Sequence, residues 1–326
     1  IVGDKCKIVI GGAHPTVDPE SCINYDHVVV GEGEEALLNY NTWDTRTISY
    51  PAIEDIDSIP YPDRSLIDIK SYKYYIDGEL ATPIMTSRGC PYQCSFCSKT
   101  WTGSVRMNSP EYIASEVKYV KSLGYNAVMF FDDIFAISER RITSITDRLK
   151  PLGIIYRCFV RSDTTSNVML KMLKDSGCVE IGFGAESGSQ SILNAVGKNN
   201  LVSNNTSLVD RAREIGIRTK AFLIVGLPGE SNETCNETYN WINNVRPDSW
   251  DISIYTPYKG SAIMNNPSKY DIVIDTSSFD DMWYKGIPGK YKCHIHTSNM
   301  SSNEILMWRD KIENELGGLR YDHRKI

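Results

Sequence analysis

Short apolar runs alternate with longer amphipathic stretches through the middle of the chain, from residue 81 to residue 256. Most of the apolar runs are rich in Val, Ile, Phe or Tyr, as is typical of strands buried on both faces of a parallel sheet. The stretches between them repeat apolar residues every three to four positions, which indicates helices packed on that sheet. The predicted strands are 82–87, 127–131, 154–160, 179–183, 219–225 and 250–255, and the predicted helices are 110–123, 138–150, 167–176, 190–195, 207–215 and 233–245.

Strands that alternate with helices predict parallel βα units, and six such units follow one another here. Six units form either a (β/α)6 partial TIM barrel or an open doubly wound sheet, and the pattern alone fits both folds. In both, the carboxyl ends of the strands share one edge, and ligands bind at that edge. Distinctive polar residues follow each predicted strand, so we expect a site there.

A smaller α/β pattern precedes these units. Two predicted strands, 7–10 and 27–30, run into the glycine turns Gly11-Gly12 and Gly31-Glu32-Gly33. Glycines after a strand let the backbone approach a ligand closely. Glu32 and Glu34 resemble a pair of acid/base carboxylates. Carboxylates at the start of a helix are also favoured by the helix dipole, and we prefer this electrostatic role for the pair.

The chain divides into four parts. Residues 1–45 form the small α/β unit, and residues 46–80 form a proline-containing linker without sustained periodicity. Residues 81–257 form the six-unit domain. Residues 258–326 form a loop-rich extension, which we expect to close over the mouth of that domain, and an amphipathic helix at 302–316.

Composition narrows the class of protein. A length of 326 residues is enough for about two domains. The net charge of −6 and pI near 5.5 argue against a nucleic-acid-binding surface. No apolar run reaches the ~20 residues of a membrane span, and nine cysteines suit a reducing compartment. We therefore expect a cytoplasmic protein that binds neither nucleic acid nor membrane. The chain begins at Ile1 rather than Met, so we also expect an N-terminal portion to be missing.

Three cysteines lie close together just after the first strand of the six-unit domain. Cys90, Cys94 and Cys97 are spaced by four and three residues, so their thiolates can reach one metal centre at little cost in loop entropy. Thiolates favour iron–sulfur clusters or zinc. A structural zinc site needs a fourth protein ligand, and no Cys or His lies within fifty residues on either side. A [4Fe–4S] cluster held by three thiolates keeps one iron open for a ligand.

This motif resembles the signature of radical S-adenosylmethionine (SAM) enzymes: C-x-x-x-C-x-x-C with an aromatic residue, Phe96, before the last cysteine. In that family the open iron binds SAM, and transfer of one electron cleaves it to a 5′-deoxyadenosyl radical. Thr86 to Gly89 and Pro91 match a large subgroup whose members often bind cobalamin. The resemblance favours the partial barrel over the open sheet. A zinc knuckle and a chance group of buried thiols are the alternatives.

The resemblance also implies a SAM site built from strand ends. Phe96 would cover the cluster and touch the adenine, and Asp132 or Asp133, after the second strand, would point at the cofactor. Arg161 follows the third strand, and Glu186 and Ser187 follow the fourth. The residues after the fifth strand that would pass near the adenine are Gly226 and Gly229. For Arg161, a structural ion pair with Asp163 or Glu186 is an equal alternative.

The N-terminal unit is similar to the C-terminal half of the Rossmann-like cobalamin-binding domain found in one branch of the family. The motifs Gly-Gly-x-His-x-Thr and Gly-Glu-Gly-Glu both recur there, and the glycine-rich turn lies against cobalamin. The corresponding residues are Gly11, Gly12, His14, Thr16, Gly31, Glu32 and Gly33. A simple packing role for His14 is the more economical interpretation.

The resemblance implies a [4Fe–4S] cluster, SAM and cobalamin as cofactors, a small-molecule substrate, and a one-electron donor such as flavodoxin or ferredoxin. With cobalamin beside the cluster, the expected reaction is methyl transfer to an unactivated carbon. Oxidative cyclisation or rearrangement is the first alternative. A non-catalytic Cys-rich metal-binding module is the alternative from another class, and the acidic pI and six βα units speak against it.

Overall fold

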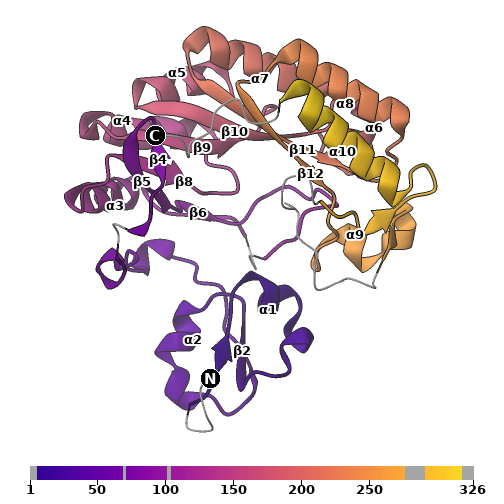
Figure 1. Ribbon diagram of the computed structural model, residues 1–326. Helices are drawn as coiled ribbons and strands as arrows, with labels where there is room; N and C mark the ends of the chain where they lie inside the picture. Colours follow the sequence, from indigo (N-terminus) through magenta and orange to yellow (C-terminus); the bar gives the residue numbers. More distant parts are fainter. Residues whose placement is uncertain (1–5, 69–70, 101–103, 276–290, 318–326) are drawn as a thin grey trace.

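A curved sheet of six parallel strands dominates the molecule (Figure 1). The computed structural model describes residues 6–68, 71–100, 104–275 and 291–317. The parallel strands lie side by side in chain order, and β4 (Tyr75–Ile76) adds an antiparallel strand beside the first of them. They are β5 (Glu79–Ile84), β8 (Ala127–Phe130), β9 (Ile155–Val160), β10 (Cys178–Glu186), β11 (Arg218–Val225) and β12 (Ser249–Ile254). This is the predicted partial TIM barrel.

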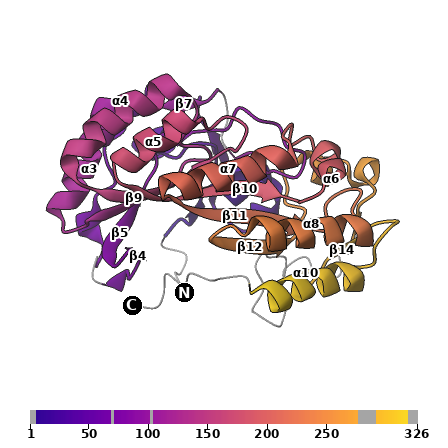
Figure 2. The same cartoon turned by 90° about the horizontal axis from the view of Figure 1, so that it is seen from above.

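Helices cover the outer face of this sheet, as Figure 2 shows from above. Serine side chains cap several of their N-termini, since each accepts a hydrogen bond from a backbone N–H of the first turn. The helices between the strands are α3 (Pro110–Ser122), α4 (Glu139–Leu149), α5 (Asn167–Asp175), α6 (Gln190–Ala195), α7 (Val202–Ile215) and α8 (Asn232–Val245). Their bounds lie within two residues of the predictions, except that α7 begins five residues earlier.

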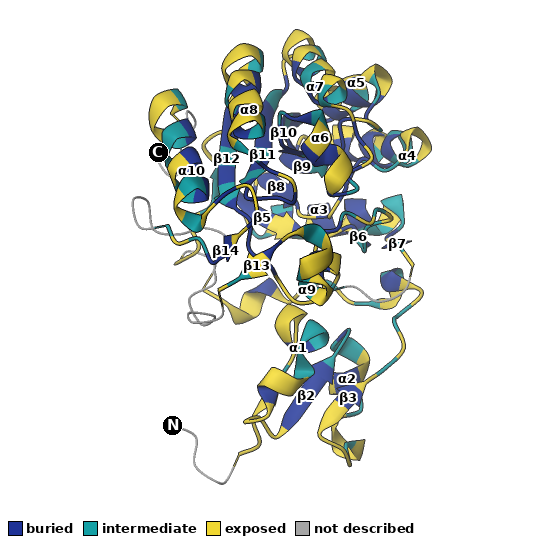
Figure 3. Ribbon diagram, turned by 90° about the vertical axis from the view of Figure 1, so that its right-hand side faces the viewer, coloured by how far each residue is buried: buried dark blue, intermediate teal, exposed yellow. Residues whose placement is uncertain are grey.

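The core lies between the sheet and this helical layer, and Figure 3 shows the buried strands beneath helices whose outer faces are exposed. Alternate strand residues such as Phe130, Tyr156 and Phe183 point into the core and are at most 1% exposed. The other alternate residues, including Arg157, Glu180 and Lys220, face the inside of the curve. These inner positions form the walls that support the site.

The N-terminal unit is a small parallel sheet with two short helices. Its strands β1 (Val9–Ile10), β2 (His27–Val30) and β3 (Thr47–Ser49) lie in the order β1-β2-β3, with α1 (Ala13–Val17) and α2 (Glu34–Leu38) between them. Strand β3 falls within the predicted linker, so this sheet extends beyond residue 45. Thr47–Ser49 is too short and too polar for the sequence pattern to mark it as a strand.

Ion pairs on two sides fix the N-terminal unit against the barrel. Glu32, just before α2, pairs with Arg88 and Arg106 of the barrel's first loop. On the other side, Asp18 Oδ2 lies 2.9 Å from Lys259 Nζ, in the segment that follows β12. The carboxyl edge of the small sheet therefore faces the mouth of the barrel (Figure 1).

The C-terminal extension packs at the far edge of the barrel. Helix α9 (Ala262–Asn265) follows β12, and β13 (Val273–Ile274) pairs with β14 (Ile295–His296). Helix α10 (Ser302–Leu316) has the predicted bounds and buries Ile305, Trp308 and Ile312 beside α8. The loop predicted over the mouth at 258–290 is described only to residue 275. Among the described residues, no helix is both long and apolar enough to cross a bilayer.

Candidate functional site

The cysteine loop emerges from the carboxyl end of β5 and is closed at its base by a two-stranded ladder. Strand β6 (Ser87–Arg88) pairs antiparallel with β7 (Arg106–Met107), so the loop leaves and returns at one point. Ser95 fixes its middle, because its backbone N–H donates to the Val196 carbonyl at 2.9 Å and its own carbonyl accepts from Ile263 N at 3.1 Å. The loop is thus held from both α6 and α9.

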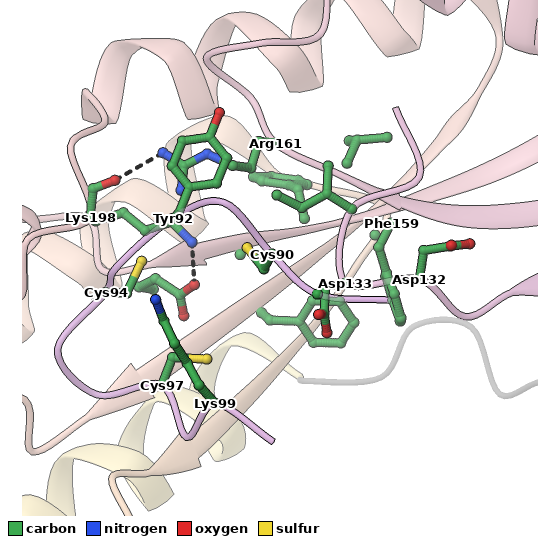
Figure 4. Close-up of a pocket in the computed structure, with 18 of the residues that line it drawn as sticks. Cys90, Tyr92, Cys94, Cys97, Lys99, Asp132, Asp133, Phe159, Arg161 and Lys198 are labelled. Carbon is green, nitrogen blue, oxygen red and sulfur yellow. Dashed lines mark hydrogen bonds and ion pairs between the residues drawn. The ribbon is translucent and has the colours of Figure 1, made fainter. Parts of the chain in front are cut away.

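All three cysteines of this loop line one cavity of about 420 Å³ at the mouth of the barrel (Figure 4). The described residues lining this cavity include no further cysteine and no histidine. Burial raises the pKa of Cys90, and burial followed by the nearby Cys94 raises that of Cys97 to about 11. Nowhere in the described ranges do three or more Cys, His, Asp or Glu side chains gather closely enough to hold a metal ion. The three thiols therefore surround an open part of the cavity and do not form a closed site for a single metal ion.

Arg161, at the end of β9, braces the cysteine loop. Its guanidinium carbon lies 3.6 Å from the ring centroid of Tyr92, which stands between Cys90 and Cys94. The same guanidinium donates to both carboxylate oxygens of Asp163 at 2.9 Å and to the carbonyl of Lys198 at 2.9 Å. The structure thus has the ion pair with Asp163 that was one of the two sequence interpretations, and Arg161 also lines the cavity.

Glu186 and Lys198 form a buried ion pair on the cavity wall, with 2.6 Å between Lys198 Nζ and Glu186 Oε1. Strand β10 breaks its register between Gly184 and Glu186, and Glu186 has a positive φ of 60°. Such a backbone conformation is strained for a non-glycine residue and is concentrated at functional sites. A Cβ on Gly184 would lie 2.1 Å from Glu186 Oε1, so only glycine leaves room for the pair.

The adjacent aspartates after β8 point in opposite directions, as alternation predicts. Both Asp132 and Asp133 are among the residues that line the cavity, and burial raises the pKa of both carboxyls. Asp132 is fully buried, and its Oδ1 accepts hydrogen bonds from Thr86 N at 2.9 Å and from the hydroxyls of Thr86 at 3.0 Å and Ser87 at 2.5 Å. Figure 4 shows Asp133 nearer the cysteines and Asp132 turned away. Of the two, Asp133 is placed to meet a ligand.

Of the other residues predicted to contact SAM, some line the cavity and some do not. Phe96 lines the cavity, whereas Ser187 is fully buried and hydrogen-bonds Thr238 of α8 at 3.0 Å. Gly226 and Gly229 lie outside the cavity lining. A Cβ on Gly226 would lie 3.1 Å from Ile295 and from Ile305, so this turn packs under the C-terminal extension.

The residues predicted to contact cobalamin gather at the carboxyl edge of the small sheet. Gly12 and Gly31 have positive φ values of 105° and 90°, and a Cβ on either would meet nothing within 4 Å. Thr16 joins the turns, because its hydroxyl donates to Gly12 O at 2.7 Å and accepts from Gly31 N at 3.0 Å. Gly11 packs on Val29, while Gly33 has open space around it and precedes α2.

Two of the residues predicted to contact cobalamin, His14 and Glu32, instead contact other side chains of the protein. His14 Nε2 lies 2.8 Å from Ser21 Oγ on the surface, in agreement with a packing role. Glu32 is buried, and it accepts hydrogen bonds from Arg106 and, at 3.1 Å, from Ile53 N. Burial raises the pKa of Glu32, but its arginine partners outweigh this and leave the pKa below its usual value.

Residues 84–242 match the family model described as the radical SAM superfamily, and this span contains the cysteine loop, Arg161 and Glu186. They form a radical SAM domain.

The chain is also similar to proteins with assigned names. The chain is 29% identical over 81% of its length to an uncharacterized methyltransferase of Pyrococcus horikoshii and covers 65% of that protein. It is 29% identical over 83% of its length to the anaerobic magnesium-protoporphyrin IX monomethyl ester cyclase of Cereibacter sphaeroides and covers 50% of it. The chain thus spans one half to two thirds of these relatives.

A solved structure shows the same fold. The radical S-adenosylmethionine methyltransferase TsrM from Kitasatospora setae, with cobalamin and a [4Fe–4S] cluster bound, superposes with a TM-score of 0.65. The two chains are 14% identical, and the similarity covers 84% of this chain and 61% of TsrM. The partial barrel and the N-terminal unit are therefore a known arrangement.

A radical SAM domain implies a [4Fe–4S] cluster and SAM, and the cavity of this chain fits both. Three soft thiol ligands suit iron, and the absence of a fourth Cys or His from the described lining leaves room for a ligand on the cluster. The Glu186–Lys198 pair and Asp133 supply carboxylates and a cation beside the thiols, as the charged methionine part of SAM requires.

Sequence analysis missed several residues of the radical SAM domain that line the cavity. Lys198 follows the short helix α6, and no local motif connects it with Glu186. Tyr92 lies inside the cysteine motif but is not one of its recognised positions. Phe159, Gly182 and Phe222 occupy inward-facing positions of their strands, and alternation along each strand could have identified them.

Proposed function

We propose that this chain is the catalytic portion of a cobalamin-dependent radical SAM methyltransferase that acts on an unactivated carbon. The observation that carries the proposal is the cavity in which Cys90, Cys94 and Cys97 meet the Glu186–Lys198 pair, with no fourth Cys or His in its described lining. A cluster bound there would supply one electron to SAM, the step by which radical SAM enzymes begin hydrogen abstraction.

The side chains of this cavity have distinct tasks under this proposal. The three cysteines hold the cluster, and Arg161 fixes their loop through Tyr92. Asp133 and Glu186 would face the ammonium and ribose hydroxyls of SAM, and Lys198 would offer a cation to its carboxylate. Phe96 would cover the cluster side of the cavity.

The support for cobalamin comes from the N-terminal unit. Two glycine turns with open space beside them lie at the carboxyl edge of its sheet, where α/β sheets bind their ligands. This edge faces the barrel mouth, because a Cβ on Gly260, after β12, would lie 2.8 Å from Val17 of α1 and 3.1 Å from Ser98 Oγ of the cysteine loop. A cofactor on the glycine turns would therefore lie near the cysteine cavity.

A radical cyclase is the second candidate function. The relative from Cereibacter sphaeroides is named a cyclase and is as similar in sequence as the methyltransferase from Pyrococcus horikoshii. In either case we propose a small-molecule substrate, a one-electron donor such as flavodoxin or ferredoxin, and a cytoplasmic location.

The test is anaerobic reconstitution of the chain with iron, sulfide and hydroxocobalamin, reduction of the bound cobalamin to cob(I)alamin, and reaction with SAM labelled in its methyl group. A methyltransferase converts cob(I)alamin to labelled methylcobalamin and forms 5′-deoxyadenosine with a reductant. Formation of 5′-deoxyadenosine without cobalamin methylation favours the cyclase. Stoichiometric zinc with no iron would contradict both and support a non-catalytic metal-binding module.

A further inference from the structure

Three phenylalanine rings form a continuous layer inside the cysteine cavity. Phe131 follows β8, Phe159 is on β9 and Phe222 is on β11, and all three line the cavity. The ring centroids of Phe131 and Phe159 are 5.7 Å apart at an interplanar angle of 61°, and those of Phe159 and Phe222 are 5.6 Å apart at 74°. Both contacts are edge-to-face, the arrangement that aromatic quadrupoles favour.

A glycine in the central strand allows this layer to form. Gly182 of β10 lies between the strands that carry Phe159 and Phe222 and also lines the cavity. A Cβ on Gly182 would lie 2.8 Å from the Phe159 ring and 3.0 Å from the Phe222 ring. Any other residue would push the rings apart, so the glycine and the two phenylalanines form one unit.

The layer is an apolar surface beside a polar one. Phe131 is 56% exposed, an unusual state for a large aromatic side chain at the mouth of a barrel. None of the charged residues that line the cavity belongs to the layer; they are the Glu186–Lys198 pair, Arg161, Asp132, Asp133 and Lys99. A ligand that covers the rings would gain apolar burial at about 25 cal/mol per Å².

We propose that the Phe131–Phe159–Phe222 layer binds a planar, apolar ring of the substrate, an inference that rests on the proposed function of this cavity. Rings at edge-to-face angles present both faces and edges, and a flat aromatic guest meets both more closely than a puckered aliphatic one. The adenine of SAM fits the layer less well, since its nitrogen-bearing edge needs hydrogen-bond partners that ring carbons do not provide.

If the three rings had only a structural role, their preference among bound molecules would differ from that of a substrate site. Beneath them, Lys220 pairs with Asp251 at 3.0 Å and Arg157 with Glu180 at 3.3 Å, and Lys220 Nζ lies 5.6 Å from the Phe222 centroid. If the rings only shielded these ion pairs, the layer would bind aromatic and aliphatic guests in proportion to their hydrophobicity. A pair of probes matched in size separates the two roles.

The experiment titrates benzyl alcohol and cyclohexylmethanol into the anaerobically reconstituted protein with saturating SAM, and follows binding by saturation-transfer NMR. The two probes have the same heavy atoms and hydroxyl and differ in aromaticity. We expect benzyl alcohol to bind about fivefold more tightly. Phe159→Leu and Phe222→Leu, which retain apolar volume, should each abolish this preference. Tyr40→Leu, which removes an exposed aromatic ring of the N-terminal unit, should leave it unchanged.

Equal or weaker binding of benzyl alcohol by the wild-type protein would overturn the proposal. Binding of benzyl alcohol only in a parallel titration without SAM would also overturn it, because that result would assign the layer to adenine. The wild-type comparison needs no variant, so the test remains decisive if a leucine variant fails to fold. Failure of the proposed function would be recorded separately, as absence of 5′-deoxyadenosine in the same preparation.

Discussion

At the scale of single residues, neighbours in sequence have separate tasks because their side chains leave the backbone in opposite directions. Asp132 is fully buried and holds the base of the cysteine loop through Thr86 and Ser87, whereas Asp133 lies nearer the cysteines (Figure 4). The sequence could narrow the choice to this pair, but not further, since both follow the same strand. Packing around the strand end decides which one faces a ligand.

Exchange of each aspartate for asparagine should separate these tasks. Asp132→Asn weakens buried hydrogen bonds to a carboxylate, so we expect a loss of about 1–3 kcal/mol in the free energy of unfolding. Asp133→Asn should leave stability nearly unchanged and weaken SAM binding several-fold. Urea unfolding and equilibrium dialysis with SAM measure the two effects, and the same loss of stability in both variants would contradict the assignment.

Arg161 should act on the cluster without binding it. Arg161→Gln removes the contact with Tyr92 and the ion pair with Asp163, so the cysteine loop loses its support from β9. We expect a lower iron content after reconstitution and a broadened EPR spectrum of the reduced cluster, with partial recovery in Arg161→Lys. Arg213→Gln, which breaks an exposed pair with Asp210, is the control. A normal spectrum in Arg161→Gln would show that the bracing is unimportant.

At the scale of elements, the sequence predicted most strands and helices because their apolar period is strong over many residues. It predicted Ser187, Gly226 and Gly229 near a cofactor because they follow strand ends. In the structure Ser187 contacts α8, Gly226 packs under the C-terminal extension, and Gly229 lies beside α6. Lys198 was not predicted, because its pairing with Glu186 leaves no local signal. Alternation could have assigned Phe159 and Phe222 to the inner face, but not the contacts between their rings. Short elements such as β3 were missed for lack of length.

The turn after β11 should give stability a dependence on pH. Glu230 is fully buried, its carboxylate accepts hydrogen bonds from Gly226 N and Leu227 N, and burial raises its pKa to about 7. The folded state therefore holds a proton that the unfolded state loses above its ordinary pKa of 4.5. Stability attributable to this group should fall as pH rises from about 4.5 to about 7, by on the order of 3 kcal/mol.

Glu230→Gln tests this dependence, because the amide oxygen can still accept both hydrogen bonds without titrating. We expect the free energy of unfolding of the variant, relative to that of the wild type, to be higher at pH 8 than at pH 5. Urea titrations at the two pH values measure it, and a difference independent of pH would show that Glu230 is ionised in the folded protein throughout.

At the scale of the whole molecule, one buried carboxylate joins the two α/β units. Glu32 of the N-terminal unit pairs with Arg88 at 3.0 Å and also with Arg106, and these arginines belong to the ladder that closes the cysteine loop. The sequence predicted this residue as a cobalamin contact or a helix-start charge. The link between the units depends on a pairing across 74 residues that no local pattern reveals.

Glu32→Gln should loosen this junction, because it leaves two arginines without their buried counter-charge, at a cost of about 3 kcal/mol. Hydrogen exchange should then quicken in β2 and in the β6–β7 ladder together. Glu34→Gln, which breaks a more exposed pair with Arg88, is the matched control and should cost less than about 1 kcal/mol. Faster exchange confined to one unit would refute the coupling.

The central claim is that Cys90, Cys94 and Cys97 hold a cluster with one iron left open for SAM. The most direct measurement is EPR of the reconstituted, reduced protein before and after addition of SAM. We predict about four irons per chain, a [4Fe–4S] signal that shifts when SAM is added, and loss of the signal in Cys94→Ala. A cluster spectrum that SAM leaves unchanged would contradict the claim.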